Sequence, residues 1–451
     1  MRRCRASRER GREWARVLSM LSVMRYILSE WREKSPRLQF SLKVRQSWSL
    51  VMSGNRVRLL FLNVGHAYAH YFMLIHPTVA VALESRGQGD YGALLLPATA
   101  GFVAFAAFTL PAGWLGDRWS RHGMMAVMFL GLGAASLLTA FASSPFQMAA
   151  GLFLMGSFAA IYHPVGIALV AESGEGVGQA LGVNGVWGNM GVAAAPLVTG
   201  ALTGMFGWQA AFLIPGALCL ASGIAYLMLV PAERGKREAS AAAAEPPAAV
   251  PTAVALPGRI LAYLVITALM GGLVFAATTV VLPKVMEDAF NGGGNGLVSA
   301  AGLASMVFAC ASVAQLVTGR AVDRVSPRQL MLLLALLQVP LFLLMGQAGQ
   351  WWVVALSLGL MITVFGVIPV QDAIVARHTA SDWRARVYAV KYVLSLGVGA
   401  LAVPIVAWGY DPASGFVRLY LLLAACAVGV ALAALLLPAR RYAQAALGDS
   451  Q

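Results

Sequence analysis

The sequence predicts an all-α membrane protein whose twelve transmembrane helices form two six-helix halves. Of its 451 residues, 59% are hydrophobic and only 12% are charged, whereas an average soluble domain carries roughly 25% charged residues. Twelve apolar runs also approach the length of about 20 residues that crosses a bilayer. Because backbone N–H and C=O groups in lipid must be hydrogen-bonded within the segment, each run is predicted to be a helix.

Six of the predicted spans precede a polar segment and six follow it. The first six are Leu59–Leu83, Tyr91–Leu115, Met124–Ala142, Phe146–Ala171, Gln179–Leu202 and Trp208–Val230. The second six are Ile260–Leu282, Leu297–Gly319, Leu330–Gly346, Trp351–Gln371, Val387–Trp408 and Leu419–Leu437. The predicted organisation is a leader at 1–58, a half at 59–230, a linker at 231–258, a half at 259–437 and a tail at 438–451.

Positive charge is concentrated on one predicted side of the membrane. Residues 1–58 hold 15 Lys and Arg against 4 Asp and Glu, which is +11 of the chain's net +14. With the N-terminus inside, 29 of the 33 Lys and Arg fall in cytoplasmic segments, whereas Arg86, Lys284 and Arg418 fall in external loops and Lys391 within a span. This bias predicts cytoplasmic N- and C-termini in a bacterial inner membrane. Because the basicity belongs to a leader that suits anionic lipid, no nucleic-acid partner is expected.

The leader itself has two interpretations. Met52 opens MSGNRVRLLFLNVG, a sequence typical of the start of a membrane protein. Residues 1–51 are therefore either a cytoplasmic leader or sequence upstream of the natural start codon. We expect their deletion to leave insertion and activity intact. No clean apolar core followed by a small-residue cleavage site indicates a secretory signal peptide.

Signatures of enzymes and cofactors are absent from the sequence. The four cysteines, Cys4, Cys219, Cys310 and Cys426, lie far apart without metal-type spacing, and three of them fall in apolar runs as small packing residues. No Walker loop, dinucleotide fingerprint or Ser-His-Asp order occurs. We therefore expect a monomeric carrier of a small-molecule substrate rather than an enzyme, with no cofactor and no metal.

A polar loop recurs in the two halves. GWLGDRWSR, between the second and third spans, and GRAVDRVSPRQL, between the eighth and ninth, align after a shift of 206 residues. The shift matches Gly113 with Gly319, Asp117 with Asp323 and Arg118 with Arg324, while Arg121 closes the first copy. The arginines are explained by topology alone, because positive charge retains a loop inside. The recurring acid is not, because acids contribute little to topology, so we predict a gate latch on each half.

The pattern G-x-L-x-D-R-x-x-R in the first loop, with a degenerate second copy and twelve spans, resembles the major facilitator superfamily. The resemblance covers roughly residues 58–437. It implies a substrate site between the two halves near the bilayer midplane. It also implies that Asp117 and its arginine neighbours lock a cytoplasmic gate against the opposite half until the carrier faces inward.

A narrower resemblance is to the fosmidomycin-resistance type of efflux carrier. It rests on GHAYAHYFMLIHPTVAVAL in the first span, AAIYHPVGIALVAE in the fourth and NGVWGNMGVAAAPLVTGAL in the fifth. The resemblance implies proton-linked export of a drug-like solute. In the G-x-x-x-G-P pattern associated with drug/proton antiporters, Ala195-Pro196 replaces Gly-Pro.

The first span places three polar residues, Asn63, His66 and His70, on one helical face. Polar groups at this depth usually face a cavity or the bundle interior. Three roles stay open: interhelical hydrogen bonding, substrate or proton handling, and transition-metal binding, although no carboxylate or thiol joins the two histidines. We expect His70, with His66 as a lesser partner, to carry proton coupling, because histidine titrates in the physiological range and no carboxylate falls at the midplane.

Further candidate residues lie in the fourth, fifth and eighth spans. Pro164 removes a backbone hydrogen bond and is predicted to kink the fourth span, where Tyr162 and His163 are candidates. The fifth and eighth spans contribute Asn184, Trp187, Asn189 and Gln315. Four glycines at 182, 185, 188 and 191 recur every third residue, which is more typical of close helix packing than of a site. Asp372 and Lys391 fall near cytoplasmic span ends and are expected to act at a gate or surface.

These features favour a proton-linked secondary carrier that exports a small organic solute or drug by alternating access. One alternative is an uptake carrier for an anionic metabolite or a metal chelate. Another is a membrane sensor or scaffold that keeps the carrier fold without transport, because fold alone does not fix function. The second half offers few polar residues within its spans, so the pocket is expected to be largely apolar.

Overall fold

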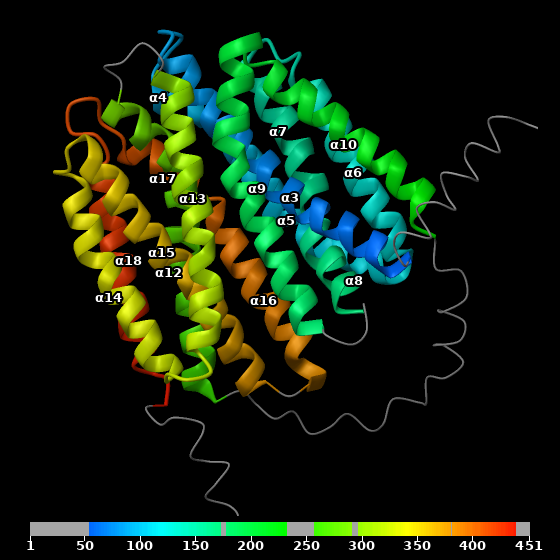
Figure 1. Ribbon diagram of the computed structural model, residues 1–451, viewed down its shortest axis with the longest axis vertical. Helices are drawn as coiled ribbons and strands as arrows, with labels where there is room; N and C mark the ends of the chain where they lie inside the picture. Colours follow the sequence, from blue (N-terminus) through cyan, green and yellow to red (C-terminus); the bar gives the residue numbers. More distant parts are fainter. Residues whose placement is uncertain (1–53, 173–176, 232–256, 291–295, 380, 439–451) are drawn as a thin grey trace, which may run out of the picture. The chain divides into compact units, whose positions relative to one another are not determined.

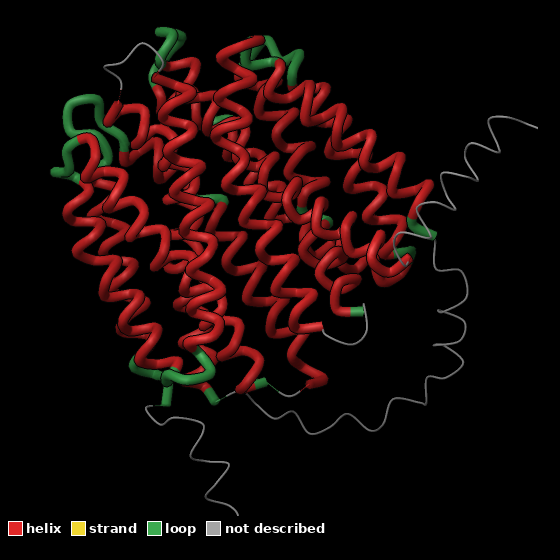
Figure 2. The backbone as a smooth tube through the Cα atoms, viewed as in Figure 1, coloured by secondary structure: helices red, strands yellow, loops and turns green. Residues whose placement is uncertain are grey.

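The computed structural model describes residues 54–172, 177–231, 257–290, 296–379 and 381–438. The chain forms two units, Met1–Arg58 and Leu59–Gln451, and the contacts described below lie within the second. The predicted leader, linker and tail fall almost entirely outside the described residues. Figure 2 shows the described chain as helices joined by short loops.

The first half is built from nine helical elements (Figure 1). They are α3 (Gly54–Glu84), α4 (Tyr91–Leu95), α5 (Ala98–Arg118), α6 (Arg121–Thr139), α7 (Pro145–Ala159), the π-helical turn η1 (Tyr162–Gly166), α8 (Ile167–Ala171), α9 (Val177–Phe206) and α10 (Ala210–Leu229). Each of the six predicted spans coincides with one helix or one run of helices. The second span is α4 with α5, and the fourth is α7, η1 and α8.

The second half repeats this plan. Its elements are α12 (Gly258–Phe290), α13 (Gly296–Ala321), α14 (Pro327–Met345), α15 (Gln350–His378), α16 (Ser381–Gly399), α17 (Ala402–Gly409) and α18 (Val417–Ala434). Two predicted ends are wrong: α12 continues eight residues beyond Leu282 to Phe290, and α15 continues seven residues beyond Gln371 to His378. Lys284 therefore lies buried within a helix and not in an external loop, because Pro283 is accommodated inside α12 rather than ending it.

The helices have the length and composition of membrane spans. Eleven stretches of the described residues are long and apolar enough to cross a bilayer. The long helix α3 falls short of that hydropathy because it carries Asn63, His66, His70 and His76. Large apolar side chains such as Leu110, Leu138 and Phe141 are exposed, as lipid-facing residues must be. The protein is thus a multi-pass integral membrane protein.

Short polar residues and one glycine mark several helix ends. The hydroxyl of Ser120 accepts a hydrogen bond from the Gly123 N–H, and that of Ser144 accepts one from the Gln147 N–H. Such N-caps satisfy amides that lack a partner inside the helix. Gly207 follows α9 with φ of +90°, a conformation that glycine adopts without the steric cost of a side chain. The loops are therefore specified locally by the sequence.

Helices pack in corresponding pairs in the two halves. In the first half α5 packs against α7 and α6 against α10, while in the second α13 packs against α15 and α14 against α18. The halves meet where α9 packs against α13 and α5 against α16, and Figure 1 shows α9 and α13 side by side. Helix α3 ends at Glu84 at one end of the bundle, and α5 runs back to Arg118 at the other. We call these the Lys284 end and the Asp117 end.

Candidate substrate and proton site

Three histidine rings from two separate segments meet inside the first half. His66 and His70 come from one face of α3, and His163 comes from η1. Nε2 of His66 lies 3.2 Å from Nε2 of His70, and the His163 ring meets these two rings edge-on at centroid distances of 5.5 and 5.3 Å. We call these residues the histidine cluster. The structure thus adds His163 to the pair that the helical spacing had placed together.

Asn184 of α9 fixes the orientation of the cluster. Its backbone carbonyl lies 2.8 Å from Nδ1 of His66, so Nδ1 must donate the hydrogen. Its side-chain amide donates to Oδ1 of Asn63 at 2.9 Å and to the hydroxyl of Tyr162 at 2.7 Å. The Tyr162 ring in turn stacks on His66 with 4.6 Å between centroids. Three predicted pathway residues, Asn63, Tyr162 and Asn184, therefore form one connected network with His66.

The π-helical turn explains how the fourth span presents two side chains. Pro164 has no N–H to donate within the helix, and the chain widens over Tyr162–Gly166. Such turns within α-helices are frequent at functional sites. Tyr162 and His163 are both buried, and the His163 ring stacks on Tyr392 of α16 with 5.8 Å between centroids. His163 therefore lies where the first half contacts the second.

Two glycines of α9 allow this helix to approach α3. A Cβ atom at Gly188 would lie 2.6 Å from Nε2 of His66, and one at Gly191 would overlap the carbonyl oxygen of Ala67. Gly182 and Gly185 face open space. The predicted packing stripe thus holds only at its C-terminal end. The reason is that a three-residue repeat does not match 3.6 residues per turn, so the glycines rotate off the contact face.

The remaining predicted pathway residues lie elsewhere. Asn189 is buried, and its Oδ1 accepts a hydrogen bond of 3.5 Å from the Gln315 amide of α13, which links the two halves. Trp187 lies on an exposed face of α9 with Val183 and Met190. It is not joined to the histidine cluster by any described hydrogen bond or ring contact.

At the Asp117 end, Asp117 pairs with an arginine of its own half. Asp117 accepts hydrogen bonds from Nε and Nη2 of Arg121 at 3.2 and 2.6 Å, and Arg121 also pairs with Glu172 at the end of α8. The guanidinium of Arg118 lies 4.6 Å from the Trp114 ring centroid. Gly113 brings α5 close to η1, because a Cβ there would lie 3.0 Å from Cβ of Pro164.

The corresponding loop of the second half has different partners. Asp323 pairs with Arg377 at 2.9 Å, while Arg324 is exposed. A Cβ at Gly319 would lie 4.0 Å from Cβ of Pro369, so the Gly–Pro approach recurs in looser form. Nearby, Lys391 pairs with Asp372 at 2.5 Å, and the lysine side chain is almost fully buried.

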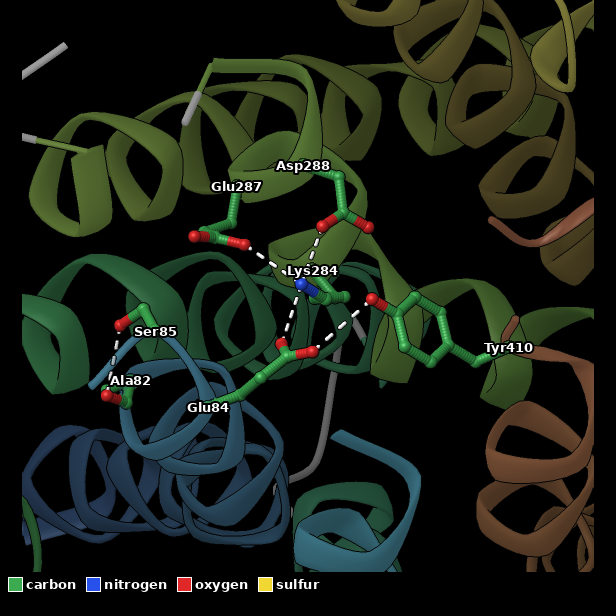
Figure 3. Close-up of polar contacts among 7 residues, drawn as sticks. All are labelled: Ala82, Glu84, Ser85, Lys284, Glu287, Asp288 and Tyr410. Atoms are coloured by element: carbon green, nitrogen blue, oxygen red, sulfur yellow. Dashed lines mark hydrogen bonds and ion pairs between the residues drawn. The ribbon is translucent and has the colours of Figure 1, made fainter. Parts of the chain in front are cut away.

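The Lys284 end holds a charge cluster that the sequence reasoning missed (Figure 3). Nζ of Lys284 lies 2.6 Å from Glu84, 3.0 Å from Glu287 and 2.5 Å from Asp288. The lysine and Glu287 side chains are only 4% and 3% exposed. Because Glu84 ends α3 in the first half and Lys284 lies in α12 in the second, this ion pair joins the halves. The signal in the sequence was K-x-x-E-D, whose spacing puts both acids on the lysine's side of a helix.

Tyr410 completes this lysine cluster, which we define as Lys284, Glu84, Glu287, Asp288 and Tyr410. Its hydroxyl donates a hydrogen bond of 3.3 Å to Glu84. Burial, followed by the nearby Asp288 carboxylate, raises the pKa of Tyr410 to about 12. The phenol therefore keeps its proton and remains a donor to Glu84 over the physiological pH range.

Two six-helix halves, a polar site between helices and charged contacts at the bundle ends define the class of membrane carriers. The family model described as Major Facilitator Superfamily matches residues 67–404. The chain belongs to this superfamily, which confirms the resemblance of the loop motif.

Solved structures of transporters share this fold. A bacterial homologue of the human lysosomal transporter Spinster, in an inward-facing and unoccupied conformation, superposes with a TM-score of 0.66 at 13% identity, over 85% of this chain and 96% of that one. A D-xylose–proton symporter gives 0.65 at 14% identity, over 84% and 95% of the two chains. At these identities the likeness concerns the fold alone.

Curated relatives match over a shorter stretch. A puromycin resistance protein of Streptomyces alboniger is 36% identical over 115 residues, which is 25% of this chain and 23% of the relative. The multidrug efflux pump LfrA of Mycolicibacterium smegmatis is 29% identical over 135 residues, or 29% and 27% of the two chains. The chain thus matches about a quarter of the length of these relatives.

Proposed function

We propose that the protein exports a small organic solute from a bacterial cytoplasm in exchange for protons, by alternating access. The observation that carries this proposal is the histidine cluster, which places groups able to exchange a proton inside the bundle. Glu84 and Lys284 also join the halves at one end. With the termini cytoplasmic, this joined end faces outward, as expected for a carrier that is closed outside.

The histidine cluster is the proposed proton site. Nδ1 of His66 donates to Asn184, so its Nε2 carries a lone pair toward His70 at 3.2 Å. His70 must then supply the hydrogen of this contact, and it can take up a second proton on its other nitrogen without breaking it. No described carboxylate lies in the cluster, and histidine exchanges protons in the physiological range. The proposal therefore assigns coupling to His70, with His66 as its acceptor.

Two names among the relatives support export as the direction. One relative is named for puromycin resistance and another as a multidrug efflux pump, and efflux removes a toxic solute from a cell. The surroundings of the cluster are aromatic, with Tyr162 and Tyr392 flanking the histidines. Aromatic side chains suit planar organic solutes. Puromycin is accordingly the first probe to test, and fosmidomycin is added because of the narrower sequence resemblance.

The decisive experiment is solute movement in proteoliposomes under an imposed pH gradient. The full chain should move a retained probe against its gradient, and His70→Gln should abolish this accumulation while still exchanging the probe at equal pH. His76→Gln is the matched control. His76 lies buried on the same helix, and its described hydrogen bond is to the Leu94 carbonyl and not to the histidine cluster. If the double variant His66→Gln/His70→Gln still accumulates the probe with unchanged pH dependence, the proton assignment is wrong.

Counterflow separates a carrier from a scaffold that has kept the fold. A panel selected by thermal shift provides the probes, because a ligand that binds only the folded state stabilises it by mass action. A carrier exchanges labelled probe for unlabelled probe without any gradient. Failure to exchange every stabilising compound would favour a sensor or scaffold over the proposed exporter.

A further inference from the structure

The histidine cluster brings together a set of nitrogen ligands that no single helix contains. The ring nitrogens of His66, His70 and His163 include one from each residue that lie within 4.8 Å of one another. This is the one group of three metal-ligating side chains with such spacing in the part of the chain that the structure describes. The two histidines of α3 are separated by four residues, the spacing at which a helix offers two ligands to one ion.

His66 is prepared to act as a ligand through Nε2. Its Nδ1–H is committed to the Asn184 carbonyl at 2.8 Å, the type of outer contact that orients metal-bound histidines and fixes their tautomer. Its Nε2 lies 3.2 Å from Nε2 of His70. Two nitrogens bound tetrahedrally at about 2.0–2.1 Å are roughly 3.3 Å apart. The first two ligands are therefore already at the separation that a tetrahedral ion requires.

His163 supplies the observation that points to a ligand. Both of its ring nitrogens are buried and have no hydrogen-bond partner among the described residues, although buried polar groups are almost always hydrogen-bonded. Its ring edge lies against both His66 and His70. A shift on the order of 1 Å would bring one of its nitrogens to bonding distance from a shared ion.

We propose that His66, His70 and His163 bind one divalent transition-metal ion, with Zn²⁺ as the type case. Three imidazole ligands and no carboxylate suit Zn²⁺, Ni²⁺ or Cu²⁺ and disfavour Mg²⁺ and Ca²⁺, which prefer oxygen. Three protein ligands leave a fourth position for water or solute. This binding goes beyond the proposed export, because it requires no transport. Since an ion and a proton compete for the same lone pairs, a bound ion would also inhibit proton-driven export.

The test is metal titration of the purified full chain without a polyhistidine tag, after removal of metal with a chelator. Co²⁺ serves as the spectroscopic probe, and Zn²⁺ as the competitor. The wild type should bind one Co²⁺ with the absorption of a tetrahedral site. His163→Gln and His70→Gln should each weaken binding by at least about tenfold. His76→Gln, on the same helix but outside the cluster, should bind like the wild type.

Two results would overturn the proposal. One is a wild type that binds no Co²⁺, and the other is a His163→Gln variant with unchanged affinity and spectrum, which would leave at most a two-histidine contact. Should His163→Gln fail to fold, His70→Gln remains informative because its ring is only half-buried. Thermal unfolding of the wild type needs no variant: Zn²⁺ should raise the unfolding temperature while Mg²⁺ should not, and equal responses would contradict the site. Loss of transport in the pH-gradient assay leaves this binding test unaffected.

Discussion

The two halves share a fold but divide the chemistry between them. The shift of 206 residues places His66 and His70 of the first half on Gly272 and Ala276 of the second. A shift of 205 residues, which aligns HPVGIALVA with IPVQDAIVA, places His163 on Ile368. At the Lys284 end the relation is reversed. The positions of Lys284, Glu287 and Asp288 correspond to Thr78, Val81 and Ala82. The first half therefore supplies the histidine cluster, and the second supplies most of the charges of the lysine cluster.

In both halves the repeated loop pairs its acid with an arginine, but the arginines are at different positions. Asp117 binds Arg121, which also binds Glu172. In the second half Pro327 stands at the position of Arg121, and Arg377 stands at that of Glu172. Asp323 pairs with this Arg377. Both acids are thus paired with an arginine, although the arginine comes from a different helix in each half.

The largest expected effect on transport is that of Gly188→Ala, because this substitution acts on the half that holds the histidine cluster. The new methyl would lie 2.6 Å from Nε2 of His66, so the ring must move away from His70 and Asn184. A displacement of about 1 Å can lower the rate on the order of 100-fold. We expect proton-driven transport and Co²⁺ binding both to fall severely. Proteoliposome uptake and metal titration would measure these losses.

Gly185→Ala is the matched control for this substitution. It lies on the same helix, and a Cβ there meets nothing within 4 Å. Replacing glycine by alanine in an unstrained helix stabilises it by up to about 1 kcal/mol. Transport and metal affinity should therefore stay at wild-type levels. Equal damage from both substitutions would mean that α9 responds to any side chain, and not to contact with His66.

The next largest effect is expected from Lys284→Gln, at the end where the second half supplies the charge. The substitution leaves Glu84, Glu287 and Asp288 without their shared cation, and removing one partner of a buried ion pair typically costs about 3–5 kcal/mol. We expect a lower unfolding temperature. We also expect a cysteine introduced at the Lys284 end to react more readily with thiol reagents. Arg418→Gln is the control, because its side chain is 59% exposed and its 4.0 Å contact with Asp411 is loose. If Lys284→Gln changes neither the unfolding temperature nor the reagent access, the lysine cluster does not hold this end closed.

The helical spans and the repeated loop motif were predictable because they rest on periodic or local patterns. Apolar length predicts a span wherever it occurs, and Asn63, His66 and His70 share a face by helical geometry alone. His163 could not be joined to them from sequence, because this contact depends on how η1 packs against α3. Lys284 was misplaced for a related reason. A lysine after a proline reads as a loop residue until three carboxylates, one of them from another helix, are seen around it.

Asp117→Asn and Asp323→Asn sharpen the comparison of the two loops, with smaller effects. Oδ1 of Asp117 accepts from two N–H groups of Arg121, and charge-assisted hydrogen bonds are the stronger kind. Arg377 reaches Asp323 through Nη2 and also donates to the Val322 carbonyl. Exposed pairs contribute about 0–1 kcal/mol, so expression should be intact. Transport should slow by roughly two- to fivefold in Asp117→Asn and less in Asp323→Asn. If Asp117→Asn transports at the wild-type rate in both directions, Asp117 has no role in the gate.

The smallest expected effect separates Gly113→Ala from Gly319→Ala, two positions that the repeat makes equivalent. A methyl at 319 would meet Cβ of Pro369 at 4.0 Å, an ordinary contact, whereas one at 113 would lie 3.0 Å from Cβ of Pro164. Gly319→Ala should therefore gain the helix preference of alanine, up to about 1 kcal/mol, and Gly113→Ala should lose it to crowding. Thermal unfolding in one detergent should place Gly319→Ala at or above the wild type and Gly113→Ala below it. Since Pro164 follows His163 in the π-helical turn, only Gly113→Ala should also weaken Co²⁺ binding. If both variants unfold at the same raised temperature, the approach of α5 to η1 is no tighter than its counterpart, and the two halves differ only in their polar side chains.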